Sequence, residues 1–190
     1  MLQTGWKSVR MRVFSRLPIG LTAALLSIAQ VFGTTLEQLT LADMAQQSTS
    51  IVRARVTGSR SASKGPAIYT YFQLQVLETW KSAPRVVTEV AVPGGAVDGV
   101  RQSVTGAPEL KSGQEYVLFL WTSRSGLTQI MGLSQGRFSV LGNMVQRPAA
   151  SELMLDRSGR PVEDRLMSLT IQDLRAQVLQ SLRQTPGGAK

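Results

Sequence analysis

The feature that most constrains this fold is a series of short apolar runs separated by Gly, Pro and Ser, which fills residues 86–140. Runs of about five to eight residues bounded by turn residues are typical of strands, so the pattern predicts antiparallel β-structure. The most apolar run, YVLFLW at residues 116–121, is apolar at both odd and even positions. Because successive side chains of a strand point to opposite faces, this run predicts a central strand with neither face in water.

Other segments supply the remaining strands. Residues 51–56 (IVRARV) and 68–80 (IYTYFQLQVLETW) alternate with a period of two, which predicts two half-buried strands. Between them, the polar tract SRSASKGPA at 59–67 predicts a flexible loop. Further along the chain we expect a turn at 81–85, a strand at 86–92, a weaker strand or excursion at 96–105, and a bulged or coiled strand at 127–141.

Two short helices flank these strands. Thr40 and Asp43 have the spacing of a capping box, which predicts a helix or two turns within residues 34–47. Apolar residues at helical spacing from Ile171 to Leu182, with Thr170 as the cap, predict a second, amphipathic helix. Turns are expected at 142–143 and 156–159, with an additional hairpin between them. The sequence predicts a mainly β fold over residues 34–184: a small antiparallel OB-like β-barrel with a short N-terminal and a C-terminal helix.

Residues 1–33 have the pattern of an export signal. An apolar stretch at 17–33 follows four basic residues, Lys7, Arg10, Arg12 and Arg16. It is short for a stable membrane span, so it predicts a secretory signal peptide cut after Gly33 or after Ala29, with the true start at Met1 or Met11. We expect an exported protein, periplasmic or secreted; the alternative is an uncleaved anchor in the inner membrane, which would be the chain's one membrane contact.

Charge and cysteine content narrow the partners. The full chain has a net charge of +9, with 21 basic and 12 acidic residues. Removal of residues 1–33 leaves 17 basic and 12 acidic residues, a net charge of +5, which permits anionic surfaces and does not favour nucleic acid. Cysteine is absent, as in many bacterial periplasmic proteins and few eukaryotic extracellular ones. The Pro- and Gly-rich tail at 185–190 predicts disorder.

The order of these segments resembles a known module. The segments GQEYVLFL at 113–120 and QGRF at 135–138, after the strands described above, are similar to those of a group of uncharacterised exported bacterial proteins. The layout also resembles the netrin-like module of tissue inhibitors of metalloproteinases, which implies an OB-type five-stranded barrel over about half the chain. In those inhibitors an N-terminal cysteine chelates the target's zinc. This chain has no cysteine, so that activity is not carried over.

The composition excludes several kinds of catalysis. Histidine is absent as well as cysteine, which removes Ser-His-Asp, Cys-His and His-based zinc chemistry. One serine-lysine match, Ser61 to Lys64, falls in a predicted loop of a chain too short for the penicillin-binding fold. We therefore predict no catalytic residues, no metal and no cofactor, and a protein that is not an enzyme.

A binding surface is the more specific prediction. If the first two strands pair, Arg53 and Arg55 share an outward face with Tyr69, Tyr71 and Gln73. Aromatic faces flanked by guanidinium groups are how OB barrels hold extended polymers. The predicted ligand is an envelope glycan, an anionic lipid head group or a protein partner.

A second candidate lies in the loop that follows Pro93. Its residues of interest are Gly94, Gly95 and Asp98. Two alternative functions depend on this loop: an envelope hydrolase that uses carboxylates around Asp98, and a protease-inhibitor-like module that works through residues 93–98. A hydrolase requires Asp98 beside a second carboxylate in a deep pocket, whereas a binding module requires a shallow basic and aromatic strand face.

Overall fold

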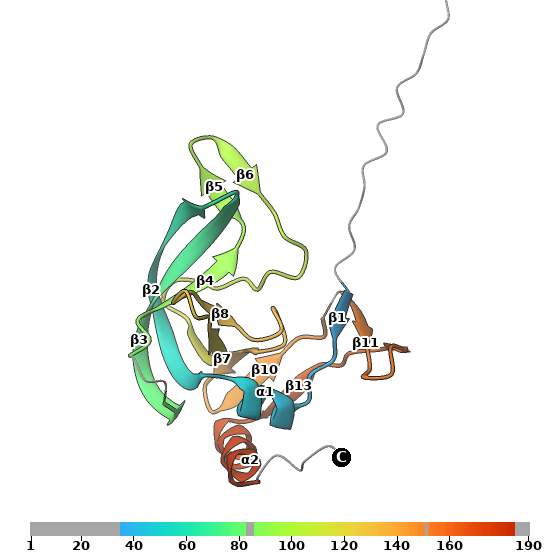
Figure 1. Ribbon diagram of the computed structural model, residues 1–190. Coiled ribbons are helices and arrows are strands. Elements are labelled where there is room, and N and C mark those ends of the chain that lie inside the picture. The colour runs from blue at the N-terminus through green and yellow to red at the C-terminus, as the bar shows by residue number, and fades with distance from the viewer. Residues whose placement is uncertain (1–34, 83–85, 151, 185–190) are drawn as a thin grey trace, which may run out of the picture. The chain divides into compact units, whose positions relative to one another are not determined.

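The computed structural model describes residues 35–82, 86–150 and 152–184. The predicted export signal, the C-terminal tail and most of the expected turn at 81–85 lie outside these ranges. The described chain is mainly β, with two helices and thirteen strands (Figure 1). Neither described helix is long and apolar enough to cross a membrane.

Five strands pair in a ring around one part of the core. The ring runs in the order β7 (Glu115–Thr122), β2 (Ser50–Lys64), β3 (Ala67–Lys81), β4 (Glu89–Pro93) and β8 (Thr128–Ile130), and β8 pairs again with β7. All of these pairings are antiparallel except that of β4 with β8. Because this last junction consists of the single residue pair Ala91 and Gln129, the ring is not clearly closed.

The predicted central strand is confirmed. β7 pairs with β2 along one edge and with β9 (Arg137–Leu141) and β8 along the other. Its residues from Tyr116 to Leu120 are at most 1% exposed, whereas Trp121, also expected inside, is 45% exposed. β7 is therefore buried on both faces over most of its length, which explains its continuous apolar sequence.

Two hydrophobic clusters lie on the two sides of this sheet. The inner cluster fills the ring and contains even-numbered residues of β7 and of the start of β2, such as Val52 and Leu118. The outer cluster contains the odd-numbered residues, such as Ile51, Val117 and Phe119. The two helices cover the outer cluster: α1 (Leu41–Gln47) contributes Met44 and α2 (Ile171–Arg183) contributes Leu174 and Val178, among others.

Both helices begin where the sequence predicts. Thr40 and Asp43 form a capping box at α1, in which each side chain bonds the other's backbone N–H. The Thr170 hydroxyl accepts a hydrogen bond from the Asp173 N–H at α2, at 3.0 Å. The α1 C-terminus receives a further partner, since the Lys81 ammonium donates to the carbonyls of Ala45 and Gln46. Burial lowers the pKa of this lysine.

Further sequence-based expectations about the strands require correction. The tract at 59–67 is not a loop, because β2 continues to Lys64 and only a tight turn at Gly65 separates it from β3. The third strand begins at Glu89 rather than at Val86. The strand expected at 127–141 is split into β8 and β9 by residues 131–136. Both ends of this segment bond β7: Met131 N donates to the Phe119 carbonyl, and Phe119 N donates to the Gly136 carbonyl.

The remaining strands extend or flank this sheet. β9 turns at Gly142 into β10 (Met144–Arg147), and β10 pairs with β13 (Met167–Thr170). The hairpin expected between the turns at 142–143 and 156–159 is therefore wrong, because β10 belongs to this sheet and the next strand, at 153–155, pairs in another one. A separate hairpin is formed by β5 (Gly95–Val97) and β6 (Val100–Gln102).

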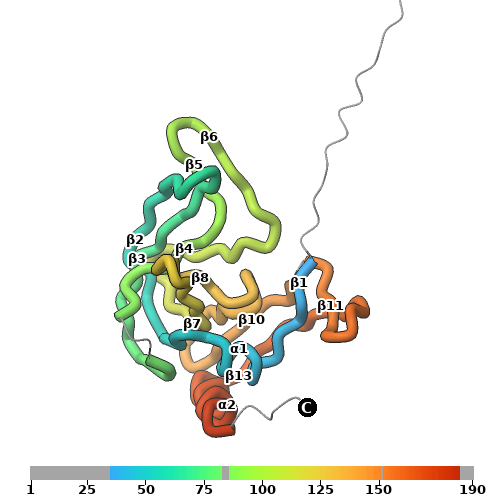
Figure 2. The backbone as a smooth tube through the Cα atoms, in the orientation of Figure 1, coloured from blue at the N-terminus to red at the C-terminus, as the bar shows by residue number. Residues whose placement is uncertain are grey.

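A small third sheet joins the beginning of the described chain to residues 153–162, an arrangement that the sequence did not predict. β1 (Thr35–Glu37) pairs in parallel with β11 (Leu153–Leu155), which pairs with β12 (Pro161–Val162). Figure 2 shows this early segment beside the late one. The expected turn at 156–159 connects β11 to β12.

Candidate functional site

The predicted arginines, Arg53 and Arg55, form an ion-pair cluster with two glutamates. Arg53 donates to Glu78 at 2.8 Å and to Glu115 at 2.9 Å, and Arg55 also pairs with Glu115. Hydrogen bonds from Arg55 and Arg53 lower the pKa of Glu115. A hydrogen bond from the Trp80 indole, and then one from Arg53, lowers the pKa of Glu78. The two guanidinium charges are therefore largely compensated within the protein.

The predicted tyrosines lie further along the same outward face of β3. The Tyr69 and Tyr71 ring centroids are 6.3 Å apart. Their β2 partners are Ala62 and Arg60 rather than Arg53 and Arg55. The Arg60 guanidinium carbon lies 4.5 Å from the centre of the Tyr71 ring, within cation–π range.

Arg60 is a residue of this face that sequence reasoning missed. Its guanidinium also pairs with Glu89 of β4 at 3.0 Å. One register shift, between Val56 and Gly58, leaves an extra residue in β2 and reverses the alternation of the strand. An even-numbered residue of β2 therefore reaches the outward face after the bulge. The only signal in the sequence was an arginine in a tract whose polarity favoured a loop.

Gln73 lies between the two groups. It pairs with Gly58 on one side and with Glu89 on the other. A Cβ at Gly58 would lie 3.0 Å from the Gln73 side-chain oxygen, so glycine makes room for this amide. The structure thus places all five predicted residues on one face of β2 and β3, in two groups: Arg53 and Arg55 with carboxylates, and Tyr69 and Tyr71 with Arg60.

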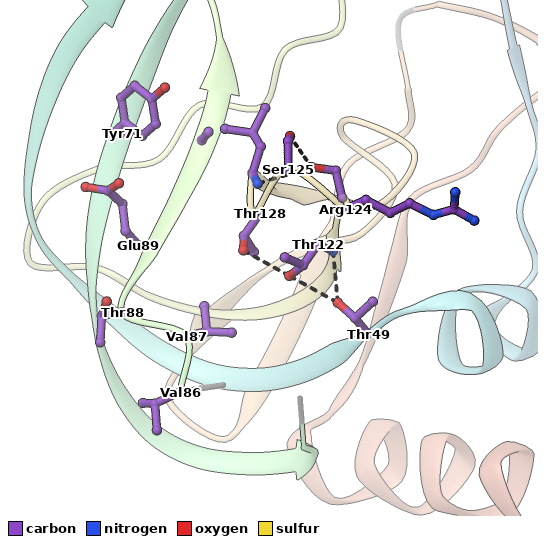
Figure 3. A pocket seen from close by; sticks show the side chains of 14 residues that line it. Thr49, Tyr71, Val86, Val87, Thr88, Glu89, Thr122, Arg124, Ser125 and Thr128 are labelled. Atoms are coloured by element: carbon purple, nitrogen blue, oxygen red, sulfur yellow. Dashed lines mark hydrogen bonds between the residues drawn. The ribbon is translucent and has the colours of Figure 1, made fainter. Parts of the chain in front are cut away.

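A groove of about 640 Å³ adjoins the tyrosine group. Figure 3 shows Tyr71 and Glu89 on one side of the groove and three threonines on the other, with Val87 between them. The threonine hydroxyls form a row: those of Thr122 and Thr128 are 2.9 Å apart, and that of Thr49 is 3.3 Å from Thr122. Sequence reasoning missed this row, because its members come from the start of β2 and from β7 and β8.

The loop predicted after Pro93 consists of the β5–β6 hairpin and of Gly94, which attaches the hairpin to β3. Gly94 and Gly95 have φ angles of 102° and 139°, and a Cβ at Gly95 would lie 2.6 Å from the Thr70 hydroxyl. Asp98 and Gly99 both have positive φ and form the two-residue turn between β5 and β6. Asp98 is exposed at this turn and lines neither the groove nor the second cavity described below.

Within residues 35–82, 86–150 and 152–184, no group of three or more Asp or Glu residues is placed to hold a metal ion. No protein-family model and no curated protein matches this sequence.

Proposed function

We propose that this protein is a non-enzymatic binding module of the bacterial cell envelope, and that it binds a glycan segment along the outward face of β3 and in the adjoining groove. The observation that carries the proposal is the composition of this groove. A partly exposed aromatic side, Tyr71 with Tyr69 beside it, faces a row of threonine hydroxyls. Sugar rings present apolar C–H faces together with rings of hydroxyl groups, so both parts of the groove have a matching partner on a glycan.

The charges of the β2–β3 face favour a glycan over an anionic lipid head group, whereas Arg124, at the far side of the groove, is in no ion pair among the described residues. Each predicted arginine on the face already has a carboxylate partner, and so does Arg60. A phosphate would have to compete with Glu78, Glu115 or Glu89 for these guanidinium groups. A neutral, hydroxyl-rich polymer needs no such exchange.

The strand pairing supports an OB-type barrel, which the resemblance to netrin-like modules implies. The ring order is β7-β2-β3-β4-β8, and its one parallel junction joins β4 to β8. These are the third and fifth of the five ring strands in chain order, and this pairing agrees with such a barrel. OB barrels bind extended oligosaccharides or oligonucleotides on the face of their second and third strands. Tyr71 and Glu89 lie on the corresponding strands here, β3 and β4.

The test measures cosedimentation of the purified protein with isolated peptidoglycan sacculi. We expect Tyr71→Ala to weaken binding about ten-fold, a loss of about 1.4 kcal/mol, because the aromatic face is removed. Tyr71→Phe keeps the ring and should bind nearly as the parent does. Thr122→Val, which replaces a hydroxyl by a methyl at similar volume, should weaken binding as well.

The matched control is Arg55→Ala, which removes a cation from the same face outside the groove. Equal sedimentation of the parent and Tyr71→Ala would contradict the proposal. So would binding to phosphatidylglycerol vesicles without binding to sacculi, since that result would indicate a lipid head group instead.

A further inference from the structure

A second cavity, of about 450 Å³, lies between the β5–β6 hairpin and residues 103–111. Its apolar lining includes Phe72, Val92, Ala107 and Leu110. Val92 and Leu110 belong to the inner cluster, and Phe72 and Ala107 pack against it. The floor of the cavity is therefore one end of the inner core, where Val92 and Leu110 are buried and Phe72 and Ala107 are partly exposed.

The rim of this cavity carries charges without partners. Arg101, Lys111 and Glu109 all line it and all are exposed. Among the described residues, no ion pair joins any of the three to an opposite charge. This rim has a net charge of +1, whereas the arginines of the β2–β3 face are compensated by carboxylates.

Hydrogen bonds fix the hairpin above the cavity. The Ile68 N–H donates to the Gln102 side-chain oxygen at 2.6 Å, and the Thr70 hydroxyl donates to the Gly94 carbonyl at 2.9 Å. Gly94 N in turn donates to the Ile68 carbonyl at 2.8 Å. Because the base of the hairpin is tied to β3 in this way, the wall that the hairpin gives to the cavity is preorganised, which reduces the ordering cost of binding.

We propose that this cavity binds a small single-chain amphiphilic anion. Its apolar chain would cover the end of the inner core, and its carboxylate head would lie toward Arg101 and Lys111. The volume lies in the range of about 300–1,000 Å³ that is usual for small-molecule sites, which favours one chain over a two-chain lipid. The site is separate from the glycan groove, and it does not depend on the proposed function.

The test is isothermal titration calorimetry. The gene for the full chain is expressed, and the protein is purified in the form that the cells produce from it. The probes are decanoate, 1-decanol and inorganic phosphate. We expect saturable binding of decanoate, about ten-fold weaker binding of 1-decanol because its head is uncharged, and no saturable binding of phosphate alone.

Variants separate the two parts of the cavity. Arg101→Ala with Lys111→Ala should weaken decanoate binding about ten-fold and leave 1-decanol binding unchanged. Glu109→Gln should strengthen decanoate binding, because it removes the one carboxylate of the rim. Ala107→Trp should fill the cavity and abolish binding of both decanoate and 1-decanol. Arg124→Ala, at the other groove, is the matched control and should change none of these affinities.

Three results would overturn the proposal: no saturable decanoate binding, equal affinities for decanoate and 1-decanol, or association with phosphatidylglycerol vesicles in place of free decanoate. The outcome is distinguishable from that of the glycan experiment. The Arg101→Ala and Lys111→Ala protein should still sediment with sacculi, and Tyr71→Ala should still bind decanoate.

Discussion

At the scale of single residues, the arginines of this protein differ in the groups that their guanidinium charges contact. Arg53 and Arg55 hold two glutamates between strands, whereas Arg60 lies over an aromatic ring. Arg147 is buried and makes two parallel hydrogen bonds of 2.8 Å to the Asp164 carboxylate. Asp164 also accepts from the Ala150 N–H, so this pair ties β10 to the chain on both sides of the third sheet.

The Arg147–Asp164 pair should make stability depend on acidity. Burial alone would raise the pKa of Asp164, but hydrogen bonds from Arg147 and Ala150 outweigh it and lower that pKa. Because the folded-state pKa is depressed, this stabilisation is complete above about pH 4, where an unfolded aspartate is ionised, and is lost as the pH falls through the folded value. Asp164→Asn should cost about 3–5 kcal/mol at neutral pH, since it leaves the Arg147 charge buried and unpaired.

Urea unfolding at a series of pH values measures this effect. The variant should show a flatter fall in unfolding free energy below about pH 4 than the parent does, because one proton-linked group has been removed. Asp156→Asn is a control on an exposed aspartate whose pKa is lowered by a hydrogen bond from Ser158 and by others within its own turn. A neutral-pH loss for Asp164→Asn no greater than that for Asp156→Asn would contradict the interpretation.

At the scale of elements, β1 is held by a single buried side chain as well as by β11. The Gln135 amide accepts from the Leu39 N–H at 2.8 Å and donates to the Glu37 carbonyl at 3.0 Å. Gln135 is 1% exposed, and it lies in the excursion between β8 and β9. One glutamine side chain thus connects β1 and the residues after it to the segment between β8 and β9.

Gln135→Leu should loosen β1. The substitution leaves one backbone donor and one backbone acceptor without partners, at about 1–3 kcal/mol each if they stay buried. Hydrogen exchange should show lost protection at residues 35–39, with much smaller changes in β2 and β7. Gln135→Glu keeps an acceptor for Leu39 and should give an intermediate loss. Unchanged protection at 35–39 in Gln135→Leu would show that β11 alone holds β1.

At the scale of the whole described chain, two hydrophobic clusters share one strand. Leu118 of β7 belongs to the inner cluster and Phe119 to the outer one, and both are fully buried. Since β7 cannot leave one cluster and stay in the other, the two clusters should unfold together.

Leu118→Ala and Phe119→Ala should therefore lower the same unfolding transition. Expected losses are about 2–5 kcal/mol for the leucine and about 3–5 kcal/mol for the phenylalanine. Circular dichroism reports the sheet, and the fluorescence of Trp80, buried in the outer cluster, reports that side. Leu77→Ala, at a position 40% exposed, is the control and should change stability by less than about 0.5 kcal/mol. Separate transitions by the two probes would contradict the shared-strand interpretation.

The sequence by itself determined the features that depend on local patterns. Continuous apolarity at 116–120 predicts a strand buried on both faces, the Thr40 and Asp43 spacing predicts a capped helix, and the stripe of α2 predicts its docking face. Each of these depends on neighbours within a few residues, so a single chain segment carries the whole signal.

Only the tertiary structure decided which residues meet. The bulge of β2 between Val56 and Gly58 reverses its alternation, so that Arg60 rather than Arg55 reaches Tyr71. The threonine row and the second cavity likewise join segments far apart in the chain. Strand register is set by packing across the sheet rather than by the strand's own residues, and a shift of one residue exchanges the two faces of a strand. That is why the sequence could indicate the fold class and several residues of the β2–β3 face, but could not assign these residues to their partners.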